Sequence, residues 1–123
     1  MEKSGQMPFF YAENVTAEII ERYVREVSRI YGSHLRKIIL YGSYARGDFR
    51  EDSDIDIMIL VDLDDSEIKA AGRRLSDVTF DINFDFDVLI MPIVQNAAFF
   101  EHWVGAYPFF NQINNEGIEL YAA

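Results

Sequence analysis

The stretch KIILYGSYARGDFREDSDIDIMILVD, residues 37–62, decides the fold because it contains two strand patterns joined by a polar loop. Its apolar start, residues 37–41, stops at Gly42, as expected of a short buried strand. In its second half the isoleucines alternate with other residues, so they share one face, and Asp54 and Asp56 share the other. The stretch therefore predicts two carboxylates side by side at the start of the second strand.

Helix and strand patterns continue on both sides of this pair of strands. In chain order they predict a helix from the N-cap Thr16 to Gly32, the strands 37–41 and 54–62, a helix from residues 64–66 to Ile82, a strand at 86–90 ended by Pro92, a helix at 96–104, a turn or short helix at 108–115 and an edge strand at 118–121. This order implies an α+β layered fold, a small mixed β-sheet flanked by helices, in a single domain over residues 1–123.

Charge and composition limit the partners that we expect. The chain has 21 acidic and 11 basic residues and a formal net charge of −10, which repels a nucleic-acid backbone, so we expect no nucleic-acid partner. It has no cysteine, hence no disulfide and no thiolate chemistry. No apolar run reaches signal-peptide or membrane-spanning length, so we expect a cytoplasmic protein without a membrane partner. Residues 48–87 hold 13 of the acids and 4 of the bases, which indicates either a solvated face or a place for cations.

The loop between the two strands combines a phosphate seat with a carboxylate pair. Gly42 lets the backbone approach an incoming group, and Ser43 adds a hydroxyl where a short helix would begin. Asp54 and Asp56 repel one another unless divalent cations neutralise them, and the expected ligand is Mg²⁺. Two such ions would hold a nucleoside triphosphate and stabilise a pyrophosphate leaving group.

Other interpretations of the same residues fit less well. A calcium loop that starts at Asp52 requires Gly and Glu where the chain has Ile57 and Leu63. A Walker-type phosphate loop requires a lysine that does not follow Gly47. A merely solvated acidic strand explains each aspartate alone, but not both together with Gly42 and a serine at this spacing.

The run GSYARGDFREDSDID, residues 42–56, resembles the Gly-Ser, ten residues, Asp-x-Asp signature of the DNA polymerase beta nucleotidyltransferase superfamily, and the chain length is similar to that of its minimal nucleotidyltransferase domains. The resemblance implies that Gly42 and Ser43 contact the phosphates of the nucleotide and that Asp54 and Asp56 bind the metals.

The resemblance also implies a third carboxylate on a later strand. Asp87 fits this position, where it would complete the metal site and accept the proton of the attacking hydroxyl, and Asp85 is its competitor. Arg46 has two open interpretations, a phosphate ligand or a cap for the acidic loop.

Minimal domains of this kind resemble the antitoxin of two-gene systems whose toxin is a HEPN-type ribonuclease. The resemblance implies transfer of AMP from ATP to a toxin tyrosine, so a protein supplies the acceptor hydroxyl. Two alternatives stay open: a non-catalytic binding module that masks its partner, and a nucleotidyltransferase for small molecules of the aminoglycoside type. The aromatic residues of the last third either fill the core or form a partner surface, and the sequence leaves open whether the chain pairs with itself.

Overall fold

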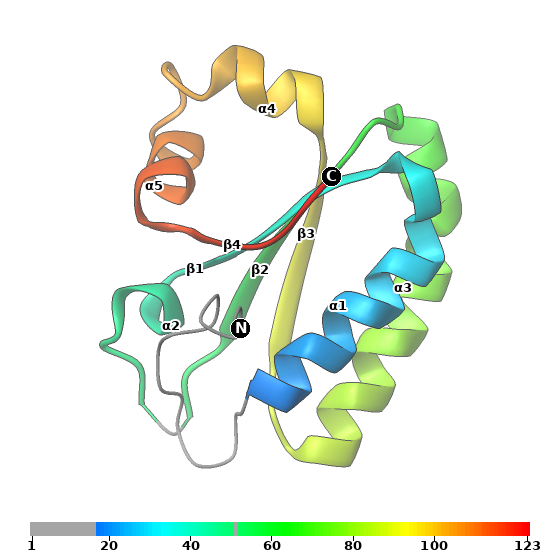
Figure 1. The fold of residues 1–123 in the computed structure, drawn as a ribbon, viewed down its shortest axis with the longest axis vertical. Coiled ribbons are helices and arrows are strands. Elements are labelled where there is room, and N and C mark those ends of the chain that lie inside the picture. Colours follow the sequence, from blue (N-terminus) through cyan, green and yellow to red (C-terminus); the bar gives the residue numbers. More distant parts are fainter. Residues whose placement is uncertain (1–16, 51) are drawn as a thin grey trace.

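The computed structural model describes residues 17–50 and 52–123 (Figure 1). The expected N-cap Thr16 lies outside these residues. The elements in chain order are α1 (Ala17–Tyr31), the 3₁₀ turn η2 (Gly32–His34), β1 (Leu35–Tyr41), α2 (Ser43–Arg46), β2 (Ile55–Val61), α3 (Asp65–Phe86), β3 (Ile90–Asn96), α4 (Ala97–Trp103), α5 (Pro108–Glu116) and β4 (Ile118–Ala122). No helix in the described part of the chain is long and apolar enough to cross a bilayer.

The four strands form one mixed sheet in the order β3-β2-β1-β4. β1 is antiparallel to both β2 and β4, whereas β2 and β3 are parallel. Figure 1 shows α1 and α3 along one face of this sheet, with α4 and α5 on the other side. The predicted α+β architecture, a small mixed sheet flanked by helices, is confirmed.

Both faces of β2 are buried, each in a different apolar cluster. Ile55, Ile57 and Ile59 are fully buried in the cluster that contains the apolar residues of α1 and α3. Met58 and Leu60 point the other way and pack with residues of α4 and α5. The predicted alternation of faces is therefore correct, and it places Asp56 on the α5 side of the sheet.

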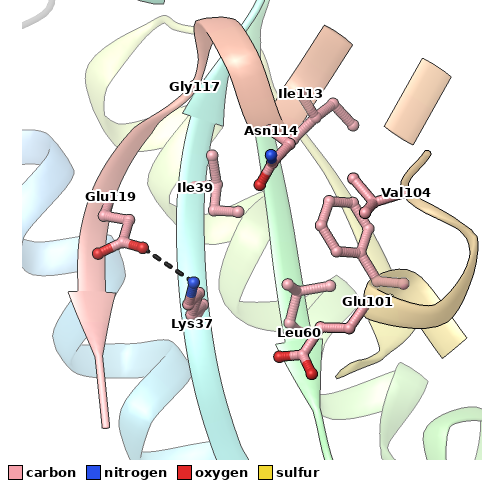
Figure 2. Close-up of a pocket in the computed structure, with 10 residues that line it drawn as sticks. Lys37, Ile39, Leu60, Glu101, Val104, Ile113, Asn114, Gly117 and Glu119 are labelled. Carbon is pink, nitrogen blue, oxygen red and sulfur yellow. Dashed lines mark ion pairs between the residues drawn. The ribbon is translucent and has the colours of Figure 1, made fainter. Parts of the chain in front are cut away.

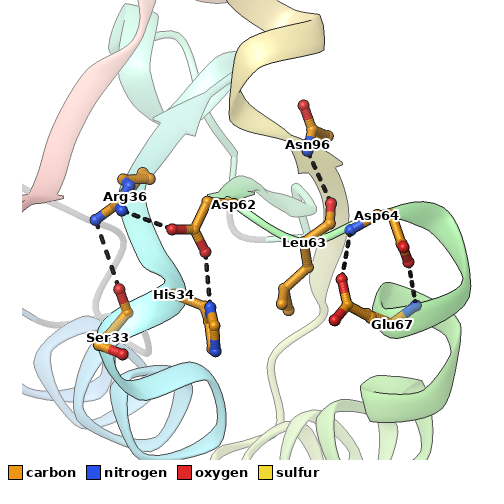
Figure 3. Close-up of polar contacts among 8 residues, drawn as sticks. All are labelled: Ser33, His34, Arg36, Asp62, Leu63, Asp64, Glu67 and Asn96. Carbon is orange, nitrogen blue, oxygen red and sulfur yellow. Dashed lines mark hydrogen bonds and ion pairs between the residues drawn. The ribbon is translucent and has the colours of Figure 1, made fainter.

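Polar contacts hold the start of the long helix α3 and the nearby end of β2 in place. Asp64 accepts a hydrogen bond from the Glu67 N–H, and the Glu67 side chain accepts one from the Asp64 N–H, which forms a capping box at the start of α3 (Figure 3). Just before it, Asp62 pairs with His34 at 2.8 Å and with Arg36 at 2.6 Å. These contacts tie the end of β2 to the start of β1.

The third strand differs from the predicted one. Residues 86–90 were expected to form it and Pro92 to end it, but α3 continues to Phe86 and β3 runs from Ile90 to Asn96 with Pro92 inside. The helix continues because Phe86 extends its apolar face and lies 5.5 Å beneath the Arg22 guanidinium. Proline is tolerated because β3 is an edge strand, where an outward N–H has no ladder partner.

The start of β3 is held by a side chain of α3. The Asn83 amide oxygen accepts a hydrogen bond from the Ile90 N–H at 2.8 Å, and its amide nitrogen donates to the Ile90 carbonyl at 3.3 Å. One side chain thus satisfies both backbone groups of the first residue of the edge strand.

We predict that Asn83→Ala lowers the free energy of unfolding by about 1–2 kcal/mol, because two partly buried backbone groups lose their partner. Urea denaturation measures the free energy of unfolding of both proteins. The matched control Asn115→Ala, which removes an exposed amide from α5, should change the value by less than about 0.5 kcal/mol. Equal effects of the two substitutions would contradict the assigned role of Asn83.

Candidate active site

The candidate site lies where β1 ends and β2 begins. Tyr41, the last residue of β1, is the register partner of Asp56 on β2. Gly42 and the short helix α2 follow directly, so the turn runs beside the aspartate pair. The structure thereby brings together Gly42 and Asp56, which are 14 positions apart in the sequence.

Gly42 is the point of closest approach between the turn and the carboxylates. A Cβ at this position would collide with Asp56 Oδ2, and the backbone has a φ of 76° and a ψ of −154°, a region reserved for glycine. The Gly42 carbonyl accepts hydrogen bonds from the N–H groups of Ala45 and Arg46, at 3.1 and 3.0 Å, and so begins α2. Only glycine fits both this backbone conformation and the narrow space beside Asp56.

The carboxylate pair combines burial with like charge. Asp56 is half-buried and Asp54 is exposed. Burial raises the pKa of Asp56 above its usual value, the nearby Asp54 charge raises it further, and the Arg46 guanidinium partly offsets both effects. The fold therefore holds a carboxylate where its negative charge is unfavourable without a cation.

Arg46 is held by two acidic residues on the rim of this site. Its Nε lies 3.3 Å from Asp48 Oδ2, and its Nη1 lies 3.6 Å from Glu116 Oε1 at the end of α5. The hydrogen bond and charge of Asp48 raise the pKa of the guanidinium, and Glu116 adds to the effect. Of the two interpretations of Arg46, the structure shows the contact with the acidic loop.

Two tyrosines, neither of which the sequence predicts as functional, complete the surroundings of the site. Burial and the Asp56 charge raise the pKa of Tyr41 to about 12, and its ring meets Phe109 of α5 edge-on at 5.8 Å. Tyr44 is buried and stacks on Phe49 at 4.5 Å, which makes it a packing residue under the loop. The position of Tyr41 directly before Gly42 is the signal that could have identified it.

Asp87 does not lie on a strand. It is the C-cap of α3, exposed, with a φ of 53° in the left-handed region, whereas Asp85 is exposed in the last helical turn. Within residues 17–50 and 52–123 no three His, Asp or Glu side chains are grouped so that they could hold a metal ion. Asp87 is nevertheless two residues from Leu89, whose carbonyl accepts a hydrogen bond from the Ile55 N–H at 2.8 Å, so its turn lies near the start of β2.

A cavity of about 200 Å³ lies elsewhere on the α5 side of the sheet (Figure 2). Its walls include Ile39 and Leu60, and the Lys37–Glu119 ion pair, 3.0 Å long, lies at its edge. The cavity touches none of the predicted site residues.

The donor set of the pair fits Mg²⁺. This ion prefers oxygen ligands and is commonly bound by one or two carboxylates together with substrate phosphates. Asp54 and Asp56 supply the carboxylates, and burial together with the Asp54 charge raises the pKa of Asp56, so a cation at this position would lower the cost of its negative charge.

Comparisons with known proteins agree on one family. The sequence model of the nucleotidyltransferase domain matches residues 20–96. A relative from Methanocaldococcus jannaschii, named "Putative protein adenylyltransferase MJ0141", is 30% identical over 103 residues, which is 84% of this chain and 96% of the relative.

Two solved structures share the fold. One, titled "Structure of putative minimal nucleotidyltransferase", has a TM-score of 0.52 at 20% sequence identity, and the match covers 87% of this chain and 98% of the solved chain. The other, titled "Crystal structure of the toxin-antitoxin with AMP-PNP", has a TM-score of 0.51 at 20% sequence identity, and the match covers 84% of this chain and 73% of the solved chain.

We predict that Gly42→Ala lowers the free energy of unfolding by about 1–3 kcal/mol, because the added methyl group enters a glycine-only backbone region and displaces the Asp56 carboxylate. Gly47→Ala is the matched control, since Gly47 has a φ of 85° but open space around its Cβ position. The control should cost only about 1 kcal/mol in the same urea denaturation experiment. An equal or larger loss for Gly47→Ala would contradict the contact with Asp56.

We predict that Asp56→Asn stabilises the metal-free protein at pH 7. The pKa of Asp56 is raised in the folded state, so its carboxylate destabilises the fold increasingly as the pH rises through that pKa, and this cost is absent below the unfolded value. The melting temperature in the presence of a chelator should rise by about 2 °C at pH 7 and stay unchanged in acid.

Asp62→Asn is the control of opposite sign. The His34 hydrogen bond, followed by the Arg36 charge, lowers the pKa of Asp62, so this carboxylate stabilises the fold above its unfolded pKa and loses that effect as the pH falls. Its substitution should lower the melting temperature at pH 7. A decrease for Asp56→Asn at pH 7 would contradict the electrostatics of the pair.

Proposed function

Since the chain belongs to the nucleotidyltransferase domain family and is a nucleotidyltransferase, we propose that it transfers AMP from ATP to a hydroxyl of a partner protein. The observation that carries the proposal is the direct approach of Gly42 to Asp56, with Asp54 beside it. This arrangement supports a triphosphate on the turn with its reacting phosphorus next to the carboxylates.

The nucleotide and the acceptor class are suggested by the similar proteins. The M. jannaschii relative is named as an adenylyltransferase of proteins, which supports AMP as the transferred group. A structure of the same fold is a toxin–antitoxin complex with AMP-PNP, an ATP analogue. We propose that this chain likewise serves as an antitoxin, with a HEPN-type ribonuclease as its toxin.

The residues of the turn bind and orient the nucleotide. Gly42 and Ser43 contact the phosphates through the start of α2, and Arg46, at the rim, exchanges its contact with Glu116 for a phosphate oxygen. Asp54 and Asp56 would hold Mg²⁺, and from the sequence we expect two ions. When bound, Mg²⁺ supplies Lewis-acid stabilisation of the charge that develops on the phosphates.

The reaction is an in-line displacement at the α-phosphorus. The acceptor oxygen forms a bond to this phosphorus as the bond to the bridging oxygen of the β-phosphate breaks, so AMP remains on the acceptor and pyrophosphate leaves. The acceptor proton passes to a carboxylate. We propose Asp87 for this role and as the third carboxylate of the site, because its turn leads directly to the Leu89–Ile55 hydrogen bond beside Asp54.

We predict that Asp54→Asn and Asp56→Asn each reduce AMP transfer about 100-fold or more, because each removes a charged ligand of the catalytic ions. The assay follows label from α-³²P-ATP into a co-expressed candidate toxin with and without Mg²⁺. Asp85→Asn serves as the matched control and should retain activity, whereas Asp87→Asn should lose it.

The same variants separate catalysis from masking. The exposed phenylalanines of α3, Phe80 at 67% and Phe84 at 77%, are a feature that favours a pure binding module. If Asp54→Asn and Asp56→Asn still neutralise the toxin fully, neutralisation rests on contact alone and the enzymatic proposal is wrong. Label transfer to an aminoglycoside instead of a protein would also contradict it.

A further inference from the structure

A row of exposed aliphatic side chains lies on the edge strand β3 and at the residue directly before it, beside Asp54 and Asp56. Leu89, Met91 and Ile93 are 49%, 45% and 41% exposed. In the parallel pairing of β3 with β2, Met91 is the register partner of Asp56, and Ile93 is the register partner of Met58. Side chains in register share a face, so this aliphatic row continues the face that carries the two aspartates.

The edge of β3 is poorly suited to accept another strand. Both backbone groups of Ile90 are already bonded to Asn83, and Pro92 has no N–H to donate. A partner therefore gains little from main-chain pairing here. What this edge offers is its row of side chains, which supports recognition of apolar groups rather than strand addition.

The line along which the acceptor attacks the phosphorus indicates that this row faces the acceptor. β2, which carries the carboxylates, lies between β1 and β3, and Gly42 and Ser43 follow the end of β1. A triphosphate held on Gly42 and Ser43 places its leaving pyrophosphate on the β1 side. In-line attack requires the acceptor oxygen on the opposite side of the phosphorus, which is the β3 side.

Charge specifies the acceptor further. Asp54 and Asp87 are exposed at the end of the sheet where this row begins, because β2 and β3 are parallel and start there together. The net charge of −10 adds to the negative potential around them. Basic side chains on the acceptor would be attracted to this end of the sheet.

We propose that Leu89, Met91 and Ile93 form the docking row for the acceptor protein, which presents its hydroxyl on a basic segment with aliphatic side chains beside it. The proposal rests on the proposed function and adds where, and by which chemistry, the acceptor is held.

Methyl NMR tests the contact without any reaction. The chain has four methionines, of which Met58 is fully buried and Met91 is 45% exposed, so their labelled methyl groups provide a probe and its internal reference. The added ligand is a synthetic tyrosine peptide with two basic and two aliphatic residues, compared with a peptide in which acidic residues replace the basic ones. The Met91 signal should shift with the basic peptide, and the Met58 signal should stay.

Transfer of labelled AMP to the same peptide tests the role of the row. Met91→Ser combined with Ile93→Ser should reduce kcat/KM for the peptide about tenfold, mainly through KM, with KM for ATP unchanged. The matched control is Phe80→Ser combined with Phe84→Ser, which removes exposed apolar area from α3 and should leave peptide transfer unchanged.

The outcomes separate the docking row from the proposed reaction. A Met91 shift with the basic peptide but no transfer would leave the docking row standing and overturn the proposed function. Transfer without a Met91 shift, or with unchanged kinetics in the double variant, would overturn the docking row alone. A Met91 shift caused by Mg²⁺-ATP alone, or by raising the concentration of the protein alone, would assign the row to the nucleotide or to a second copy and would also overturn it.

Discussion

The close approach of Gly42 to Asp56 is the constraint on which the rest of the site depends. The antiparallel pairing of β1 and β2 sets Tyr41 opposite Asp56, and the chain must then turn away at the next residue. A side chain at that residue would occupy the space of the Asp56 carboxylate. Glycine removes the conflict, so the backbone that would hold phosphates and the carboxylates that would hold cations lie in direct contact.

In this arrangement the carboxylate charges of the site destabilise the folded state. Asp56 is half-buried beside a second carboxylate, and Arg46, whose charge acts on Asp56, is shared with Asp48 and Glu116. The negative charges of such a pair lower the stability of the fold, and the binding of a cation, as we propose, would relieve this cost. The apolar clusters on both faces of the sheet supply the stability that tolerates it. Burial therefore supports function here by positioning charges, as well as by holding the chain together.

Much of this could be predicted from the sequence, because local patterns decide it. The alternation of isoleucines with Asp54 and Asp56 gives the strand and its faces, and Gly42 and Ser43 give the turn and the start of the short helix α2. A third strand could be predicted, but its bounds could not be, because the apolar face of α3 continues through Phe86 and outweighs the strand pattern of the same residues. Pro92 ends strands in most contexts, and only the sheet order shows that β3 is an edge. The contact of Arg46 with Glu116 joins α2 to α5 across the fold, and no local pattern encodes it.

A crystal structure with Mg²⁺ and a non-hydrolysable ATP analogue tests the central claim most directly. We predict metal density between Asp54 and Asp56 and phosphates against Gly42 and Ser43. The cavity near Lys37 and Glu119 is a rival location on the same side of the sheet. A nucleotide bound in that cavity, with no metal at the aspartates, would contradict the account.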